Sequence, residues 1–139
     1  MLDTNILIAL AWPNHVHHGE VMEWFLQKAV SGFCTCPITQ TGFVRISSNP
    51  AFTANAVTPA EALTLLRKIS ELPGHEFWPD DMPLGAAFPP PVLLGSHRHI
   101  TDGYLLALAT NHDGILATLD RGIAALAKHC PQRLEIVKG

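Results

Sequence analysis

The sequence predicts an α/β protein in which helices cover both faces of a five-stranded parallel sheet. Short apolar runs of strand length alternate with longer amphipathic segments along the 139-residue chain. Prolines and glycines separate the two kinds of segment. This alternation is typical of parallel sheets, because each return to a parallel strand needs a crossover connection, usually a helix. We therefore expect a three-layer α/β/α sandwich.

The composition indicates one globular domain spanning residues 1–139. Hydrophobic residues make up 47% of the chain and charged residues 15%, which is typical of a protein with a core and not of a disordered chain. The net charge of -3 lacks the basic excess of many nucleic-acid-binding proteins. An odd number of cysteines, three, favours a reducing compartment. Since no membrane-length apolar run and no signal peptide is visible, we expect a cytoplasmic protein with no membrane partner.

The chain begins with a very short strand that leads directly into a helix. Only two residues precede Asp3, so either the recorded start is truncated or the first strand is stunted. Asp3, Thr4 or Asn5 can cap the helix, because short polar side chains accept hydrogen bonds from the free N–H groups of a first turn. The helix then holds residues 6–11 and ends at Pro13.

Two helices flank a strand in the next part of the chain. The first helix is predicted over residues 15–30 from the spacing of its apolar face. That face contains Met22, Phe25, Leu26, Ala29 and Val30. Residues 33–36 form the strand, and Pro37 opens a helix that continues through Ile46.

The segment from Thr58 to Glu61 is the clearest helix start, because it combines a capping box with Pro59 at the first helical position. The buried face of this helix is predicted to contain Ala62, Leu65, Leu66 and Ile69. A strand over residues 75–78 follows. Residues 79–95 are rich in proline, and we expect an irregular segment with at most one helical turn.

The last part of the chain repeats the alternation of helix and strand. Thr101 is predicted to cap a helix that begins with Asp102, and residues 115–119 form the next strand. The final strand covers residues 134–137. Between the two strands, a helix is predicted to bury Ile123, Leu126, Ala127 and Cys130.

Three carboxylates stand at predicted strand ends or helix starts: Asp3, Asp102 and Asp120. The carboxyl ends of parallel strands meet at one edge of a sheet, where ligands bind in open α/β folds. If the strands before Asp3 and Asp120 are neighbours, the three acids lie close together. They would repel one another unless protons or a cation compensate the charge. A hard divalent cation such as Mg²⁺ prefers oxygen ligands, so the pattern predicts a magnesium site.

Each of these acids also has a structural explanation when taken alone. Asp3 can cap a helix, Asp102 can interact with a helix dipole, and Asp120 can occupy a turn. Taken together they favour function, and the chemistry that suits them is phosphodiester hydrolysis. Asn5 and Thr118 lie beside them in sequence and can orient a ligand or a water, although Thr118 can equally satisfy backbone groups.

Other motifs give weaker hypotheses. The chain has no dinucleotide-binding, P-loop or nucleophile-elbow motif. The cysteines and histidines lack the spacing of a zinc site. Arg45, Arg98 and Arg121 are candidate contacts to phosphate, and each also has a plain use as a surface charge.

Four stretches in order resemble the motifs of the PIN-domain family, in particular the VapC ribonuclease toxins of bacterial toxin–antitoxin pairs. They are Leu2-Asp3-Thr4-Asn5, residues 39–45, residues 101–107 and residues 117–122. The resemblance implies a PIN-like fold and an Mg²⁺- or Mn²⁺-dependent endoribonuclease that cuts structured RNA, such as tRNA or rRNA. It also implies a cognate VapB-type antitoxin and a homodimer. By motif position, Asp3 and Asp102 would bind metal, and Asp120 would complete the acidic pocket.

Gln40 departs from the family pattern, because many PIN domains have a glutamate at the corresponding second acidic position. Its amide can offer an oxygen or hold a water but carries no charge, which weakens a second metal site; Asp80 or Asp81 could substitute if their loop folds inward. Gln40 therefore motivates an alternative, a catalytically weak or inactive PIN-like module that binds RNA or protein. A receiver-like phosphoacceptor needs an acidic pair near the first strand and a lysine after a late strand. It is disfavoured, because Asp3 is followed by Thr4 and Asn5, and Asp120 is followed by Arg121.

Overall fold

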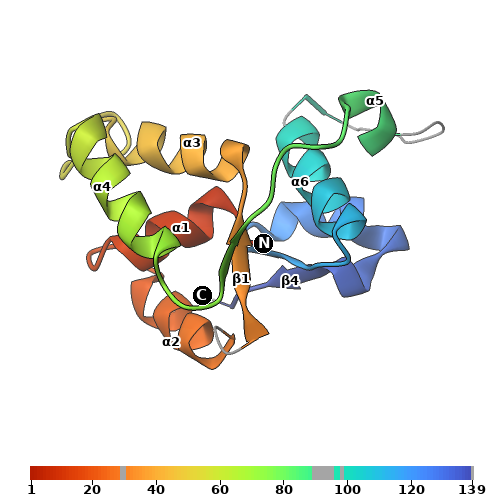
Figure 1. Cartoon of the computed structure of the whole chain (residues 1–139), viewed down its shortest axis with the longest axis horizontal. Helices are drawn as coiled ribbons and strands as arrows, with labels where there is room; N and C mark the ends of the chain where they lie inside the picture. The colour runs from red at the N-terminus through yellow and green to blue at the C-terminus, as the bar shows by residue number, and fades with distance from the viewer. Residues whose placement is uncertain (29–30, 89–95, 98, 139) are drawn as a thin grey trace.

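Parallel strands and helices alternate along the chain in the computed structural model, which describes residues 1–28, 31–88, 96–97 and 99–138 (Figure 1). Four strands of three residues each are present in that part of the chain: β1 (Phe33–Thr35), β2 (His75–Phe77), β3 (Leu116–Thr118) and β4 (Leu134–Ile136). β1 pairs in parallel with β2, and β3 pairs in parallel with β4. The predicted parallel α/β arrangement is confirmed.

The first three residues connect these two strand pairs. The backbone N–H of Leu2 donates to Cys34 O, and that of Asp3 donates to Ala117 O, both at 2.9 Å. Ala117 N–H in turn donates to Met1 O at 2.9 Å. The hydrogen bonds therefore run in the order β2, β1, residues 1–3, β3, β4. The predicted five-stranded sheet is present only in part: the four strands pair two by two, and Leu2 forms an isolated bridge to Ala117.

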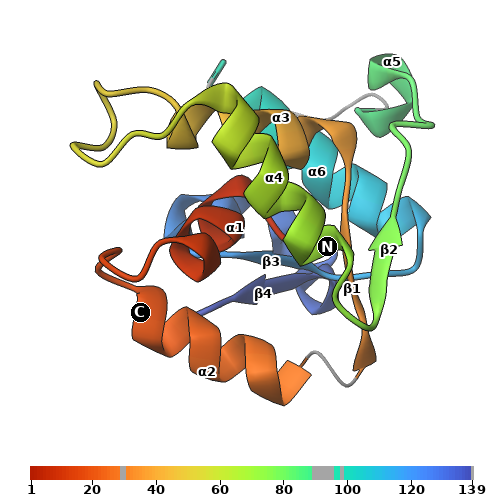
Figure 2. The ribbon, with the colours of Figure 1, turned by 60° about the vertical axis from the view of Figure 1, so that its left-hand side comes forward.

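The helices gather in two groups, one on each side of the strands (Figures 1 and 2). The first group contains α1 (Thr4–Ala11), α2 (His18–Lys28), α3 (Pro37–Ser47) and α4 (Pro59–Ser70). In it, α1 packs against α2 and α3, and α3 packs against α4. The second group contains α5 (Leu84–Ala87), α6 (His99–Asn111) and the 3₁₀ helices η2 (Arg121–His129) and η3 (Pro131–Arg133).

The buried apolar residues form two clusters, one under each group of helices. Leu2 and Ala117 belong to the cluster under the first group, whereas Met1 and Leu116 belong to the other. Successive strand residues thus point to opposite faces, as the pleat requires, and both faces are apolar because helices cover both. The buried side chains of α4 are Ala62, Leu66 and Ile69, three of the four predicted, whereas Leu65 is half-buried.

Some element boundaries differ from the prediction. α6 begins at His99, so Thr101 lies inside its first turn and does not cap it. α2 buries Val21 and Phe25, whereas the side chain of Leu26 is 67% exposed. The predicted extension of this helix to residues 29–30 lies outside the described residues. The last helix is 3₁₀, and every described helix is too short or too polar to span a membrane.

Candidate active site at the carboxyl ends of the strands

Asp3 is fixed between the first helix and β3. It is the N-cap of α1, and the residue is only 8% exposed. Its Oδ1 accepts a hydrogen bond from the backbone N–H of Thr4 at 2.6 Å. Its Oδ2 accepts from Thr118 Oγ1 at 2.6 Å and from Asn5 Nδ2 at 2.8 Å. Three donors therefore hold the carboxylate in one orientation.

The two polar neighbours predicted from the sequence, Asn5 and Thr118, hold this carboxylate. Asn5 Nδ2 also donates to Thr118 Oγ1 at 2.9 Å, and Asn5 Oδ1 accepts from the N–H of Leu119 at 3.0 Å. The Thr118 hydroxyl further accepts from the N–H of Asp120 at 3.1 Å. That hydroxyl thus donates once and accepts twice, which is its full capacity. The side chain of Asn5, predicted to meet substrate, is engaged within the protein.

Burial raises the pKa of Asp3 above its usual value, and the hydrogen bonds from Thr118, Thr4 and Asn5 oppose this effect. The negative charge of Asp120 raises the pKa of Asp3 further. The three donors show that the protein supports the ionised form of Asp3 while burial opposes it.

Asp102 belongs to the same electrostatic environment. It lies in the first turn of α6 and is partly buried. Burial raises its pKa, the negative charges of Asp3 and Asp120 raise it further, and His99 opposes them. The structure therefore brings together the three carboxylates that the sequence singled out, near enough to act on one another. Asp120 is exposed, and its Oδ1 accepts from the N–H of Gly122 at 2.7 Å.

These carboxylates suit a hard divalent cation by their chemistry. A nearby cation would favour the ionised form of each acid and so reverse the pKa shifts. Within the described residues, no three His, Cys, Asp or Glu side chains converge on a single metal position. Mg²⁺ is commonly held by one or two carboxylates and keeps several waters, so a closed protein cage is not required. Asp3 and Asp102 are the residues that would hold it.

The side chain of Gln40 is hydrogen-bonded to Thr35 and, among the described residues, to none of these acids. It lies in the first turn of α3, and its Nε2 donates to the hydroxyl of the buried Thr35 at 2.9 Å. The same hydroxyl lies 2.8 Å from His75 Nε2. Gln40 also lines a shallow pocket with side chains of α4, among them Leu66 and Arg67. Sequence position alone could not reveal this orientation.

Two of the three predicted phosphate contacts lie on the surface. Arg45 is exposed in the last turn of α3, and Arg121 is exposed at the start of η2, directly after Asp120. Arg98 lies outside the described residues. Only Arg121 follows one of the three acids directly in the chain.

Sequence reasoning began this helix at Asp102 and so missed the role of His99. His99 is the first residue of α6, three residues before Asp102, and its charge lowers the pKa of that acid. Its Nδ1 is buried and finds no hydrogen-bond partner among the described residues. Had the helix been predicted to begin at His99, the spacing of three residues would have placed His99 and Asp102 on one face.

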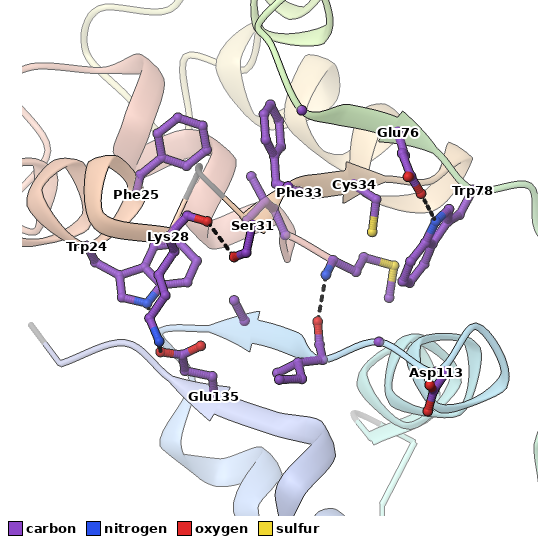
Figure 3. A pocket seen from close by; sticks show the side chains of 17 residues that line it. Trp24, Phe25, Lys28, Ser31, Phe33, Cys34, Glu76, Trp78, Asp113 and Glu135 are labelled. Carbon is purple, nitrogen blue, oxygen red and sulfur yellow. Dashed lines mark hydrogen bonds and ion pairs between the residues drawn. The ribbon is translucent and has the colours of Figure 1, made fainter.

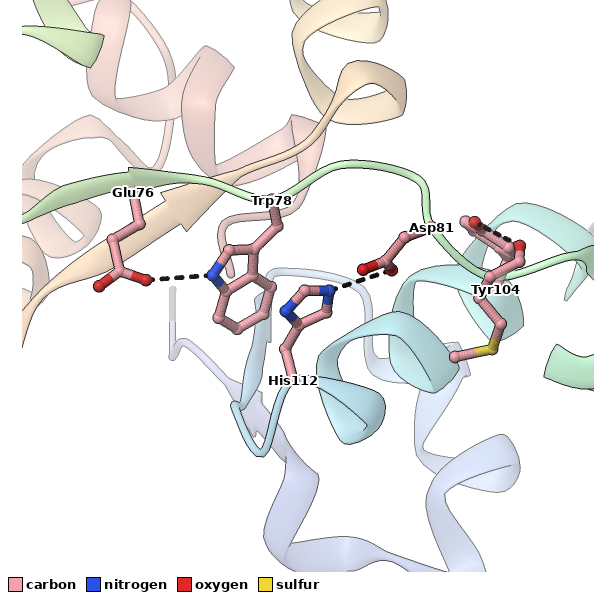
Figure 4. Close-up of polar contacts among 6 residues, drawn as sticks. Glu76, Trp78, Asp81, Tyr104 and His112 are labelled. Carbon is pink, nitrogen blue, oxygen red and sulfur yellow. Dashed lines mark hydrogen bonds and ion pairs between the residues drawn. The ribbon is translucent and has the colours of Figure 1, made fainter.

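The segment after β2 is tied to α6 and the loop that follows it (Figure 4). The Trp78 ring stacks on His112 with centroids 4.6 Å apart, and His112 Nε2 lies 3.1 Å from Asp81 Oδ1. The Tyr104 hydroxyl donates to Met82 O at 2.9 Å. The carboxylate of Asp81 is therefore paired with His112.

A separate cavity of about 360 Å³ lies near the amino ends of the strands (Figure 3). Its aromatic walls include Trp24, Phe25 and Phe33. Acidic side chains at its edge are bonded within the protein: Glu135 Oε1 accepts from Trp24 Nε1 at 2.9 Å and lies 3.5 Å from Lys28 Nζ. The cavity is therefore distinct in position and chemistry from the three carboxylates.

Comparison with known proteins finds a family match and several relatives. The PIN domain family profile matches residues 1–129. In Mycobacterium tuberculosis (strain ATCC 25618 / H37Rv), Ribonuclease VapC39 is 47% identical over 126 residues, covering 89% of this chain and 90% of the relative. Ribonuclease VapC38 of the same strain is 40% identical over 132 residues, covering 95% and 92%. Ribonuclease VapC29 is 40% identical over 126 residues, covering 91% and 89%. The chain therefore belongs to the PIN domain family, in its VapC branch.

Proposed function

We propose that this protein is a metal-dependent endoribonuclease, the toxin of a VapBC-type toxin–antitoxin pair, which hydrolyses phosphodiester bonds in structured RNA such as tRNA or rRNA. The observation that carries the proposal is the gathering of three carboxylates at the strand ends, where Asp120 raises the pKa of Asp3 and both raise the pKa of Asp102. The relatives named Ribonuclease VapC support the substrate class.

In this proposal Asp3 and Asp102 hold Mg²⁺, which Mn²⁺ can replace, and Asp120 adds negative charge beside them. When bound, the ion supplies a water of lowered pKa and stabilises charge on the phosphate. Thr118 and Asn5 orient Asp3 and favour its ionised form through the hydrogen bonds described above. One ion is favoured over two, because Gln40 is uncharged and its amide is bonded to Thr35.

Exposed arginines are proposed to contact the RNA backbone. Arg121 is the first candidate, because it follows Asp120 and is exposed. Arg45 and Arg98 are further candidates. Guanidinium groups bind phosphate oxygens in a bidentate geometry, so a few local residues can position RNA even though the net charge of the protein is -3.

The remaining expectations concern the assembly. We propose that residues 1–139 form a single PIN domain and that residues 1–3 act as the central strand of a five-stranded, three-layer sandwich. The hydrogen bonds from Leu2 and Asp3 to both strand pairs support this. We further propose a cognate VapB-type antitoxin, a homodimer and a cytoplasmic site of action, on the basis of the VapC relatives.

RNA cleavage by the purified protein tests the proposal directly. A cellular RNA pool is incubated with Mg²⁺, with Mn²⁺ or with chelator, beside the Asp3→Asn and Asp102→Asn variants. Glu23→Gln is the matched control, since it removes one exposed acid from α2. Cleavage that requires metal, disappears in both variants and persists in the control supports the nuclease. Metal-dependent cleavage retained in both variants contradicts the proposed site.

A second candidate function is the non-catalytic module that binds RNA or protein. The observation that favours it is the neutral side chain of Gln40, which is hydrogen-bonded to Thr35. Tight binding of Mn²⁺ and RNA without cleavage of any RNA in the pool would establish this alternative.

A further inference from the structure

We propose that Gly42 is a positioning residue for Asp3. The missing side chain lets α3 pack directly against Thr4, the first residue of α1, whose backbone N–H fixes the Asp3 carboxylate. This inference rests on the proposed function, in which Asp3 binds the metal ion. Gly42 does not touch the metal site and would act on it only through Thr4.

The backbone of Gly42 does not explain the glycine. Gly42 lies in the middle of α3, where its conformation is helical and any residue can adopt it. Positive φ angles occur instead at Gly32 and Gly74. Glycine weakens a helix interior relative to alanine, so the explanation must come from packing. Gly42 is buried in the contact between α3 and α1.

The packing leaves no room for even a methyl group. A Cβ atom at position 42 would lie 2.6 Å from Thr4 Oγ1, 3.0 Å from its Cγ2 and 3.4 Å from its Cβ. Contacts below 3.0 Å require one of the two residues to shift. The branched side chain of Thr4 has few staggered positions, and its Oγ1 lies 3.5 Å from Thr39 O. A methyl group at position 42 would therefore displace Thr4 itself.

Displacement of Thr4 reaches Asp3 through one short hydrogen bond. The N–H of Thr4 donates to Asp3 Oδ1 at 2.6 Å. The other oxygen of Asp3 is held independently by Thr118 and Asn5. Movement at Thr4 would thus turn the carboxylate about the oxygen that stays fixed. Partners of metal ligands commonly control metal affinity in this way.

The experiment measures Mn²⁺ affinity by calorimetry and the melting temperature on the same full-length proteins. We expect Gly42→Ala to weaken Mn²⁺ binding about tenfold. The Thr4→Ala, Gly42→Ala double variant should recover wild-type affinity to within about twofold. It lacks Oγ1 and Cγ2 of Thr4, the two atoms nearest to the added methyl group. Gly19→Ala is the matched control: this helical glycine has no atom within 4 Å of an added Cβ, and its affinity should not change.

The Asp3→Asn variant separates failure of this inference from failure of the proposed function. Unchanged Mn²⁺ affinity in Asp3→Asn, or no binding by the wild type, overturns the metal site itself. If Asp3→Asn loses binding while Gly42→Ala keeps wild-type affinity, the positioning role is wrong, even if the melting temperature falls. If Gly42→Ala does not fold, the double variant decides: wild-type affinity supports the inference, whereas weak binding or failure to fold refutes it.

Discussion

The two ends of the strands use acidic side chains in opposite ways. Near the amino ends, Glu135 binds Trp24 and Lys28, and Asp113 pairs with Arg133, so each acid has a partner within the protein. At the carboxyl ends, Asp120 raises the pKa of Asp3, and Asp3 and Asp120 both raise the pKa of Asp102. Acids of the first kind are complete as they stand, whereas those of the second kind leave negative charge uncompensated. The surroundings of an acid, and not its presence, therefore indicate where a cation is needed.

The largest expected effect comes from Asp3→Asn. The amide keeps the shape of the carboxylate but removes the charge, so RNA cleavage should fall to the level seen with chelator. Asparagine also caps helices well, but its Nδ2 cannot accept the hydrogen bonds that Oδ2 of Asp3 takes from Thr118 and Asn5, so we expect the variant to fold with a lowered melting temperature. Cleavage assays and thermal unfolding measure the two quantities. Wild-type cleavage by the variant would remove the distinction between the two strand ends.

The next effect comes from Thr118→Val, which removes a hydroxyl while keeping the side-chain shape. The buried groups of Asp3 and Asn5 lose a partner, so we expect a loss of about 1–3 kcal/mol in unfolding free energy, measured with urea. Mn²⁺ affinity should fall about tenfold. Thr64→Val on the exposed face of α4 is the control, with expected values near wild type. Unchanged affinity in Thr118→Val would show that Asp3 is oriented without it.

A smaller effect is expected from pH. Asp3 and Asp102 have folded-state pKa values raised above the ordinary 3.8, mainly by burial. The folded protein therefore binds more protons than the unfolded chain in the range above 3.8, and their contribution to stability is lost as pH rises through the folded pKa. Without metal, Asp102→Asn should flatten this decline, and Mg²⁺ should counteract it in the wild type. Melting temperatures from pH 3 upward test this. Identical slopes with and without Asp102 would contradict it.

The smallest effect is expected from Glu135→Gln, at the cavity near the amino ends of the strands. Its ion pair with Lys28 is partly exposed, so the loss in unfolding free energy should stay below about 1 kcal/mol. RNA cleavage and Mn²⁺ affinity should remain at wild-type values. A large loss of metal binding would mean that acids near the amino ends also serve the metal site.

Periodicity and local capping predicted most of the fold. The capping box at Thr58 to Glu61 and the strands near residues 33, 75, 116 and 134 were confirmed, because each depends on neighbours in sequence. The extent of the sheet was confirmed only in part. Residues 1–3 carry no strand pattern of their own, and hydrogen bonds to Cys34 and Ala117 hold them between the two strand pairs.

The candidate site was predictable only in part. The rule that ligands bind at strand ends predicted that the three acids lie close together. The effect of Asp3 and Asp120 on the pKa of Asp102 agrees with that prediction. The direction of a side chain from a helix is set by packing against other elements, so the contact between Gln40 and Thr35 could not be predicted. The Gly42 contact with Thr4 joins two helices and leaves no local signal beyond a glycine inside an apolar pattern.

The hydrogen bond between Asp3 and Thr118 also has a consequence for the timing of synthesis. It joins residues 115 positions apart, so Asp3 leaves the ribosome long before its partner exists. Chains are made at about 5–20 residues per second, and contacts of large sequence separation form late. A nascent chain therefore carries an unassembled acidic site until Thr118 has emerged. Under the proposed function, the translating ribosome and its RNA meet an assembled nuclease site only after that point.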